Sequence, residues 1–502
     1  MTDRDTARGD MADPNPITDF HVFWTAQEAF PEFERLCLGA RSSVRASFRI
    51  FDLDTPLYSR EGRAIGKTWF DLVLHKLNQG VSFDVTLSDF DPILATPEHR
   101  YSWQSARRMA AVNELSEGAS FTFRVAMHPA RVGFVPRLAL RKRVREEFEA
   151  RDPDELTPGL RELEDQADLP MVPATHHQKM AVIDSEILWI GGLDLNKRRY
   201  DSRDHERAPE QTWQDIQAKL RGPIVASAQQ HLESFLDVCD GVVDPPPTAP
   251  AFLRTISMRR QQELTFISPR NVVNEIEQAH LTALEEAEGL IYLETQFFRY
   301  PPLANALAKA AQRNPDLGCI LVVPAAPEDV AFDGNDELDA RMAAQKELEA
   351  MRILREGFGP RVVVASPAQK RRAKEEFSGA ILHDAPIIYV HSKLSLFGTQ
   401  QAILSSANLN GRSLRWDTEA GIHLTDETHV LMLWQRAITH WFGDMIIDPD
   451  EEPQESVLEV AAALEDNHSR PPERRNHFLL PYDSTRAENL AAHVPAVPDE
   501  LV

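Results

Sequence analysis

Cysteine is scarce in this sequence. Only Cys37, Cys239 and Cys319 occur among 502 residues. An odd number of scattered cysteines forms neither a disulfide framework nor a paired-cysteine metal site. The pattern excludes the small secreted proteins that depend on disulfides, and it indicates thiols kept reduced.

Long apolar runs are missing as well. No stretch of about 18 consecutive apolar residues occurs, which argues against a membrane-spanning helix. Residues 1–16 are polar and acidic, without the basic and apolar segments of a secretory signal. We therefore expect a cytoplasmic protein that meets membranes only at their surface.

Basic residues are outnumbered. The chain holds 78 acidic and 54 basic residues, a formal net charge of −24. Such a charge repels polyanions at long range, although it leaves room for a local basic cleft. It argues against a nuclease, and no nucleic-acid partner is expected.

What is present is typical of a large globular protein, with 42% hydrophobic and 26% charged residues. A chain of this length exceeds one hydrophobic core, so two packed units are expected. The clearest boundary is a proline cluster that cannot lie inside a helix or a central strand. We expect a disordered leader, a first lobe, a proline-rich linker, a second lobe and an acidic, proline-rich tail, at residues 1–17, 18–240, 241–251, 252–447 and 448–502.

Short β-branched or apolar runs alternate with longer amphipathic stretches in both halves, which predicts an α/β fold. Strands are expected at residues 47–51, 82–87, 121–126, 179–183, 187–190, 290–294, 319–323, 362–365, 387–390, 393–397 and 402–404. Helices are expected at residues 25–38, 66–79, 215–237, 274–287, 302–313 and 336–356.

Three further segments carry a distinctive composition. Residues 137–151 and 369–376 are helix-like and dense in charge, and a solvated helix face is favoured over a patch that binds lipid head groups. Residues 477–482 form an apolar island in the polar tail, and we expect them to pad the second lobe.

Two segments more than two hundred residues apart share an H-x-K pattern, His177-Gln178-Lys179 and His391-Ser392-Lys393. One such pattern is common by chance and is explained by a surface pair. The sequence that follows is repeated too, from Gly191 and from Ser405, and continues through Leu195/Leu409, Asn196/Asn410 and Arg198/Arg412. The repetition indicates an internal duplication that contains both histidines.

The repeated residues suit the chemistry of a phosphodiester. Side chains at i and i+2 of a strand share one face, so each histidine lies beside a lysine. Imidazole can attack phosphorus and leave again, while an ammonium group neutralises the charge that develops on the oxygens. Ser406 and Asn408 add donors to the same oxygens, and Gly192 and Asp194 hold the equivalent places in the first half.

Two histidines allow one to act as nucleophile and the other as acid and base. Each needs a carboxylate to fix its tautomer. Glu419 and Asp201 lie at distances along the chain that could supply one each, with Asp204 as the alternative to Asp201. A zinc site is disfavoured because the histidines lie beside lysines without clustered cysteine or aspartate.

These residues resemble the phospholipase D superfamily, whose signature is a duplicated H-x-K-x4-D followed by a Gly- or Ser-rich strand end and an Asn. His177, Lys179 and Asp184 match in full, whereas the second copy has Gly398 in place of Asp. Similarity to the eukaryotic-type branch that hydrolyses phosphatidylcholine extends over His176, Gly191 to Leu195, Tyr292 to Phe298 and Trp213-Gln214-Asp215.

The resemblance implies two α/β lobes related by a pseudo-twofold axis, each with a mixed sheet flanked by helices, and an active site at their interface that needs no metal or other cofactor. It implies His177 as the nucleophile that forms a phosphohistidine and His391 as the acid and base, an order that the symmetry of the repeat leaves open. Lys179, Lys393, Ser406, Asn408 and Asp194 are then the phosphate-binding set. Glu419 and Asp201 orient the histidines, and Asp184 is the motif carboxylate. We interpret that carboxylate as a structural anchor, which Gly398 lacks.

The leading hypothesis is an enzyme that cleaves glycerophospholipids at a membrane surface to phosphatidic acid and a head group, with water or an alcohol as acceptor. A monomer suffices, because both motifs lie in one chain. The alternatives are a phosphatidyltransferase of the cardiolipin synthase type, a nucleic-acid phosphodiesterase, and a degenerate lipid-binding member without activity.

Overall fold

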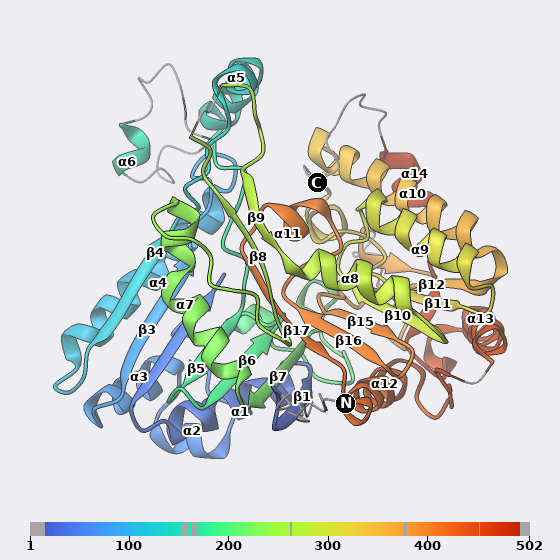
Figure 1. The fold of residues 1–502 in the computed structure, drawn as a ribbon, viewed down its shortest axis with the longest axis horizontal. Helices are drawn as coiled ribbons and strands as arrows, with labels where there is room; N and C mark the ends of the chain where they lie inside the picture. Colours follow the sequence, from blue (N-terminus) through green and yellow to red (C-terminus); the bar gives the residue numbers. More distant parts are fainter. Residues whose placement is uncertain are drawn as a thin grey trace, which may run out of the picture.

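A computed structural model describes residues 16–151, 158–162, 169, 171–261, 264–374, 379–450 and 452–491. The expected leader at residues 1–17 therefore lies almost wholly outside the described residues. The described chain builds two large mixed β-sheets, one from each half of the sequence (Figure 1).

The first sheet has seven strands in the order β1-β7-β6-β5-β2-β3-β4. Strands β2, β3 and β4 are parallel, and the other pairings are antiparallel. The strands are β1 (Asp19–Trp24), β2 (Ser43–Phe48), β3 (Ser82–Ser88), β4 (Phe121–Ala126), β5 (Met180–Ile183), β6 (Ile187–Gly191) and β7 (Ile216–Arg221).

The second sheet repeats this arrangement. Its order is β18-β12-β11-β10-β15-β16-β17-β8-β9, so the run from β12 to β8 has the order and strand directions of the first sheet. The strands are β8 (Phe252–Met258), β9 (Arg270–Asn274), β10 (Leu290–Thr295), β11 (Gly318–Val322), β12 (Val362–Pro367), β15 (Lys393–Phe397), β16 (Gln401–Ser405), β17 (Glu419–Leu424) and β18 (Leu479–Pro481), beside a small hairpin of β13 (Ile381–Leu382) and β14 (Ala385–Pro386). The duplication in the sequence is thus a duplication of the fold, and the predicted α/β architecture of two lobes is confirmed.

Helices cover the outer face of each sheet. The first sheet packs against α1 (Ala26–Gly39), α3 (Trp69–Asn78) and α4 (Thr96–Leu115), with α2 (Arg60–Ile65) beside α1. The second packs against α8 (Glu275–Glu286), α9 (Pro301–Arg313) and α10 (Leu338–Phe358). The remaining helices are α5 (Phe134–Glu149), α6 (Pro158–Arg161), α7 (Ile224–Asp240), α11 (Gly411–Arg415), α12 (Glu427–Phe442), α13 (Pro453–Ser469) and α14 (Thr485–Leu490). Among the described helices, none is both long and apolar enough to cross a membrane.

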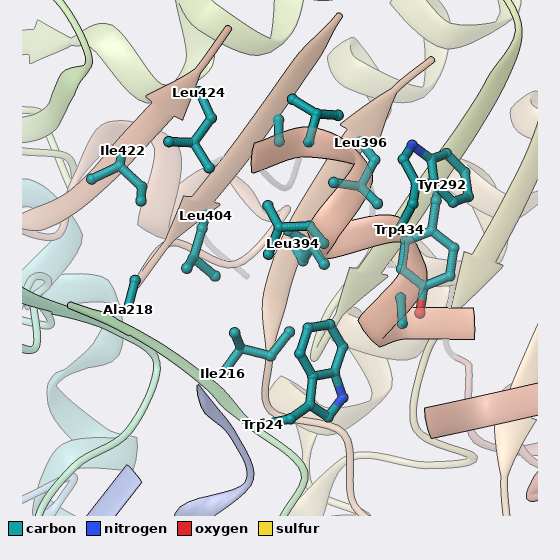
Figure 2. Close-up of a cluster of buried hydrophobic side chains, with 14 of the residues drawn as sticks. Trp24, Ile216, Ala218, Tyr292, Leu394, Leu396, Leu404, Ile422, Leu424 and Trp434 are labelled. Atoms are coloured by element: carbon teal, nitrogen blue, oxygen red, sulfur yellow. The ribbon is translucent and has the colours of Figure 1, made fainter. Parts of the chain in front are cut away.

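The inner faces of the two sheets share one hydrophobic core with α7, α12 and α13. Figure 2 shows Ile216 and Ala218 of β7 facing Leu404 and Ile422 of the second sheet. Burial of both faces explains why β5 is apolar at every residue and why every residue of β15 is buried. The shared core fixes how the lobes dock, and therefore how the two H-x-K segments meet.

Two predictions from the sequence need correction. The helix expected at residues 215–237 is strand β7 followed by α7, because β7 pairs with both β1 and β6 and Gly222-Pro223 separates the elements. Residues 453–482 of the expected tail belong to the second lobe. There, α13 buries Val457, Val460 and Leu464 in the shared core, and β18 pairs with β12.

Other expected segments have mixed outcomes. The apolar residues 477–482 pad the second lobe as predicted, because they supply β18. Residues 137–149 of the first charged stretch lie on α5, as expected of a helix, whereas the described part of the other charged stretch, residues 369–374, is not helical. Residues 387–390 form only isolated bridges in place of a strand.

Candidate active site

The two H-x-K segments meet at the interface between the lobes. Each lies at the start of a central strand, β5 or β15, and crosses to the opposite lobe. The His177 amide donates to the carbonyl of Thr418 over 2.8 Å, and the His391 amide donates to the carbonyl of Gln214 over 2.8 Å. Isolated bridges join His176 to Thr418 and Val390 to Gln214. The backbone therefore brings the two motifs together in a symmetric way.

Each histidine receives its carboxylate from the other lobe. Nδ1 of His177 lies 2.9 Å from Oε1 of Glu419, and Nδ1 of His391 lies 2.6 Å from Oδ2 of Asp215. Both carboxylates are fully buried, at the first residue of β17 and immediately before β7. A carboxylate that accepts from Nδ1–H fixes the tautomer in which Nε2 carries a free lone pair. Both imidazoles are thus oriented for nucleophilic or proton-transfer chemistry.

The imidazoles are buried in a positive environment. Burial, and then the charges of Lys179 and Arg49, hold the pKa of His177 well below its usual value. Burial, and then Lys393 and Arg199, do the same to the pKa of His391. The lysine of the opposite motif also lowers the pKa of each histidine, as expected for residues that the two backbone bridges bring close together. This environment favours the neutral form of both imidazoles.

The two lysines are buried beside their own histidines. Lys179 Nζ donates to the carbonyl of His177 over 2.5 Å and lies 3.9 Å from a carboxylate oxygen of Asp194. Lys393 Nζ donates to the carbonyl of His391 and lies 3.0 Å from its Nδ1. Burial lowers the pKa of both ammonium groups, that of Lys393 to about 7. A bound anion would favour their charged forms.

The pKa values of the two carboxyl groups are shifted in the opposite direction, upward. Burial raises the pKa of Glu419 to about 8 and that of Asp215 to about 7, and the nearby lysines Lys179 and Lys393 oppose the rise. The site therefore holds buried acids and bases whose pKa values are shifted from their ordinary ranges, a property common at catalytic centres.

The predicted donors Ser406 and Asn408 occupy different positions. The Ser406 hydroxyl donates to Oε2 of Glu419 over 2.5 Å and accepts from the Ala420 amide, so it holds the carboxylate. Asn408 is buried, and its Oδ1 has no hydrogen-bond partner among the described residues. In the first lobe, Asp194 Oδ1 accepts from the Ile50 amide over 2.9 Å. Of the two predicted donors, Ser406 is used by the carboxylate of Glu419, whereas the unpaired atom of Asn408 is an acceptor.

The prediction that Asp201 orients a histidine of the motif is not met by the geometry. Its carboxylate accepts from Nδ1 of His205 over 2.7 Å and from the amide of Trp213 over 2.8 Å. Asp204, the alternative, is exposed on the surface. The first copy has ten more residues than the second between its Asn and its acid, Asn196 to Asp215 against Asn410 to Glu419. The acid at the start of the last strand is therefore Asp215.

Asp184 lies at the far end of β5, away from the histidines. Its carboxylate accepts from the amides of Arg41, Ser42 and Ser43, just where β2 begins. In the second lobe, Gly398 adopts the same left-handed conformation, φ +51° against +53°. There the carbonyl of Pro449 accepts from the Leu290 amide over 2.8 Å. The geometry agrees with our interpretation of the motif carboxylate as an anchor, and a different segment holds the strand in the second lobe.

One buried acid near the site was not predicted from the sequence as a site residue. Glu294 on β10 accepts from the Tyr292 hydroxyl over 2.5 Å, from Nε1 of Trp441 over 2.8 Å and from the hydroxyl of Ser392, the residue between His391 and Lys393. The equivalent strand of the first lobe, β2, contains no acid, and Gln178, the counterpart of Ser392, contacts His231 over 2.6 Å. The sequence feature that could have identified Glu294 is the presence of a charged residue in the apolar run of β10.

Aromatic and cationic side chains line the site next to His391. The Trp213 ring lies 4.5 Å from the His391 ring between centroids, and the guanidinium of Arg199 lies 3.6 Å from the Trp213 ring. The Trp213-Gln214-Asp215 segment that carried part of the family resemblance thus contributes both a wall and a carboxylate to the site.

No family model matches the sequence. The chain is similar to phospholipase D alpha 3 of Arabidopsis thaliana, 23% identical over 376 residues that cover 51% of this chain and 46% of the plant protein. It is 22% identical to phospholipase D A of Dictyostelium discoideum over 323 residues, 51% of this chain and 25% of that protein. The chain therefore spans half or less of the length of these curated relatives.

The fold is shared with a solved structure. Phosphatidylserine synthase from Haemophilus influenzae superposes with a TM-score of 0.50, covering 90% of this chain and 94% of that chain at 12% sequence identity. At this level of identity the likeness shows a common fold of two lobes.

Proposed function

Because the chain is related to the phospholipase D superfamily in sequence and fold, we propose that it is a phosphodiesterase of glycerophospholipids. In this proposal it releases the head group and leaves phosphatidic acid, or transfers the phosphatidyl group to an alcohol. The observation that carries the proposal is the symmetric pairing of His177 with Glu419 and of His391 with Asp215 across the lobe interface.

The proposed first step uses both histidines. Nε2 of His177 attacks phosphorus and forms an N–P bond, while the P–O bond to the head group breaks and His391 gives a proton to the leaving oxygen. The free site holds His391 neutral, but a bound phosphodiester brings the negative charge that raises the pKa of that imidazole. Substrate binding thus prepares the acid.

The second step reverses the roles at His391. The neutral imidazole removes a proton from water or an alcohol, whose oxygen attacks phosphorus as the N–P bond breaks. Lys179 and Lys393 neutralise the non-bridging oxygens in both steps, and the Asn408 amide donates to one of them. The nature of the acceptor decides between hydrolysis and transfer.

The test incubates purified protein with phosphatidylcholine and phosphatidylethanolamine vesicles, a chelator and 1-propanol, with products read by mass spectrometry. His177→Ala and His391→Ala are compared with His75→Ala, a control on the outer helix α3. We expect phosphatidic acid and phosphatidylpropanol from the wild type and the control only. Equal product from either motif variant, or none from a folded wild type, would overturn the proposal.

The same preparation separates the alternatives. Glycerol or phosphatidylglycerol in place of propanol tests a synthase, whose product would form in preference to phosphatidic acid. Salt-sensitive binding of single-stranded DNA would favour a nucleic-acid substrate. A protein that binds lipid but forms no phosphoenzyme would be a member without activity.

A further inference from the structure

One part of the first lobe projects beside the connection between β8 and β9 (Figure 1). The start of α5 contacts this connection through its backbone. The Gly133 amide donates to the carbonyl of Phe266 over 2.8 Å, and the Val135 amide donates to that of Leu264 over 2.9 Å. We call the described residues 133–149 and 264–270 the tip.

The tip gathers exposed apolar side chains. Five large hydrophobic residues in these two adjoining segments are each between 49% and 62% exposed: Phe134, Val135, Leu138, Leu264 and Phe266. Single exposed hydrophobic residues are ordinary, but a group on one projection marks an interaction surface.

The same helix is basic in an acidic protein. Helix α5 holds five arginines or lysines and three glutamates, whereas the whole chain has 54 basic and 78 acidic residues. Arg141 and Lys142 are exposed, and so are Arg259 and Arg270 at the bases of the β8–β9 connection. The guanidinium of Arg260 lies 4.1 Å from the Phe266 ring centroid. The charge around the apolar group complements an anionic surface.

Apolar and basic residues follow one another along one face of α5. Phe134, Leu138, Arg141 and Arg145 are spaced by four, three and four residues, which places them on one side of a helix. Seven residues at 1.5 Å each separate the first phenylalanine from the first of these arginines by about 10 Å. The apolar side chains therefore lie at the end of α5 that contacts the β8–β9 connection, and the basic ones lie further along the helix.

The tip lies at the edge of the fold that carries the active site. It follows β4, and the parallel β2 ends at the same edge, where Ser47 pairs with Met180 at the start of β5. On the other side, β8 pairs Thr255 with Glu419 and runs on into the tip connection. A membrane bound at the tip would therefore lie on the side of the molecule where His177 is found.

We propose that the tip is a docking surface for an anionic phospholipid membrane, in which Phe134, Leu138 and Phe266 enter the bilayer and the arginines contact head-group phosphates. This docking proposal rests on the proposed function, because it takes the membrane as the source of the phospholipid substrate. The strongly negative remainder of the molecule is repelled by the same surface, so the local charge also orients the protein with the tip toward the lipid.

The buried side of α5 allows a clean test. Val144 and Phe148 pack with Ile93, Val132 and Met171 in a small core separate from the main ones. Exposed residues of the tip do not contribute to that core, so they can be changed without removing its packing. Leu458 on α13 is 57% exposed in the second lobe and provides a matched control.

The experiment measures sedimentation with vesicles of phosphatidylcholine alone or with phosphatidylglycerol, using His177→Ala as background so that no product alters the membrane. We expect binding to the anionic vesicles that weakens at least tenfold in the F134D/L138D variant and in the R141E/K142E variant, and that is unchanged in L458D. Added salt should weaken it as well. Binding unaffected by the tip variants, or equally strong on neutral vesicles, would overturn the proposal.

Activity separates this proposal from the previous one. With His177 intact, F134D/L138D should lose hydrolysis of vesicle lipid while a short-chain diester below its critical micelle concentration is still cleaved at the wild-type rate. If the wild type cleaves neither substrate but binds anionic vesicles through the tip, the proposed function fails and the docking surface stands. Loss of cleavage of the monomeric diester in F134D/L138D would place the tip in the active site and overturn docking as its role.

Discussion

Asp215 of the first lobe accepts a hydrogen bond from Nδ1 of His391 in the second lobe, over 2.6 Å. Glu419 of the second lobe does the same for His177 of the first. Neither lobe alone holds a histidine together with its carboxylate. The oriented pair of imidazoles exists only when the lobes are docked, so the shared core between the sheets is a requirement for the site as well as for stability.

Replacing Asp215 by Asn should reduce kcat by a factor on the order of 10² to 10⁴, because the amide stabilises the wrong tautomer of His391. Asp201→Asn is the matched control, since Asp201 contacts His205 and the Trp213 amide instead. It should lower the melting temperature while kcat stays within a few-fold of the wild type. Steady-state kinetics and thermal unfolding of both variants check this, and a large loss of kcat in Asp201→Asn alone would restore the assignment made from the sequence.

Glu294→Gln should remove a residue that positions the segment containing His391 and Lys393. An amide nitrogen in place of one carboxylate oxygen faces donors on Tyr292, Trp441 or Ser392, which costs roughly 1–3 kcal/mol of unfolding free energy. Because Ser392 lies between His391 and Lys393, we also expect kcat to fall about tenfold with KM little changed. Glu347→Gln removes another buried acid of the second lobe, bound to Tyr482 and Arg299. Equal loss of kcat in both variants would show a general effect of destabilisation.

Restoring the family's aspartate at Gly398 should not raise activity. A Cβ there would lie 2.7 Å from the carbonyl oxygen of Glu288 and near the carboxylate of Asp450. We expect Gly398→Asp to lower the free energy of unfolding by roughly 1–3 kcal/mol, and Asp450→Asn to recover part of that loss. Asp184→Ala should be destabilising by a similar amount, since it leaves three backbone amides of the β2 entry without their acceptor. Denaturant titration and kcat are measured together, and higher kcat in Gly398→Asp would contradict the anchor role.

Stability should fall as the pH drops below the usual pKa of histidine. Burial lowers the pKa of His231 to about 3 and that of His128 and His280 to about 4. In this window the unfolded chain binds protons that the folded one does not, so acid favours unfolding. Between pH 7 and pH 5 one such histidine accounts for roughly 2 kcal/mol.

His231→Gln should therefore show a smaller decrease in unfolding free energy over that pH range, by about that amount. Urea titrations of the wild type and the variant at both pH values make the comparison. A pH dependence identical in the two proteins would mean that His231 is accessible to protons in the folded state.

Local sequence was enough to predict that the two H-x-K segments lie at the starts of strands. The two H-x-K segments begin β5 and β15 because apolar runs follow each lysine, and the repeated register marked the duplication of the sheet. In the structure, Lys179 lies immediately before β5 and Lys393 is the first residue of β15, and each lysine donates to the carbonyl of its own histidine. The α/β class of both lobes came from the same local periodicity.

Contacts across the lobes were decided by the tertiary structure. Asp215 was hidden because residues 215–237 read as one helix, whereas the pairing of β7 with β1 and β6 places that acid immediately before a strand. The apolar residues 477–482 stood out in the polar tail, but the pairing of β18 with β12 is decided by the fold. Sequence fixes what each segment can form through short-range backbone preferences. Which carboxylate reaches which histidine depends on how two apolar sheet faces, distant in the chain, pack into one core.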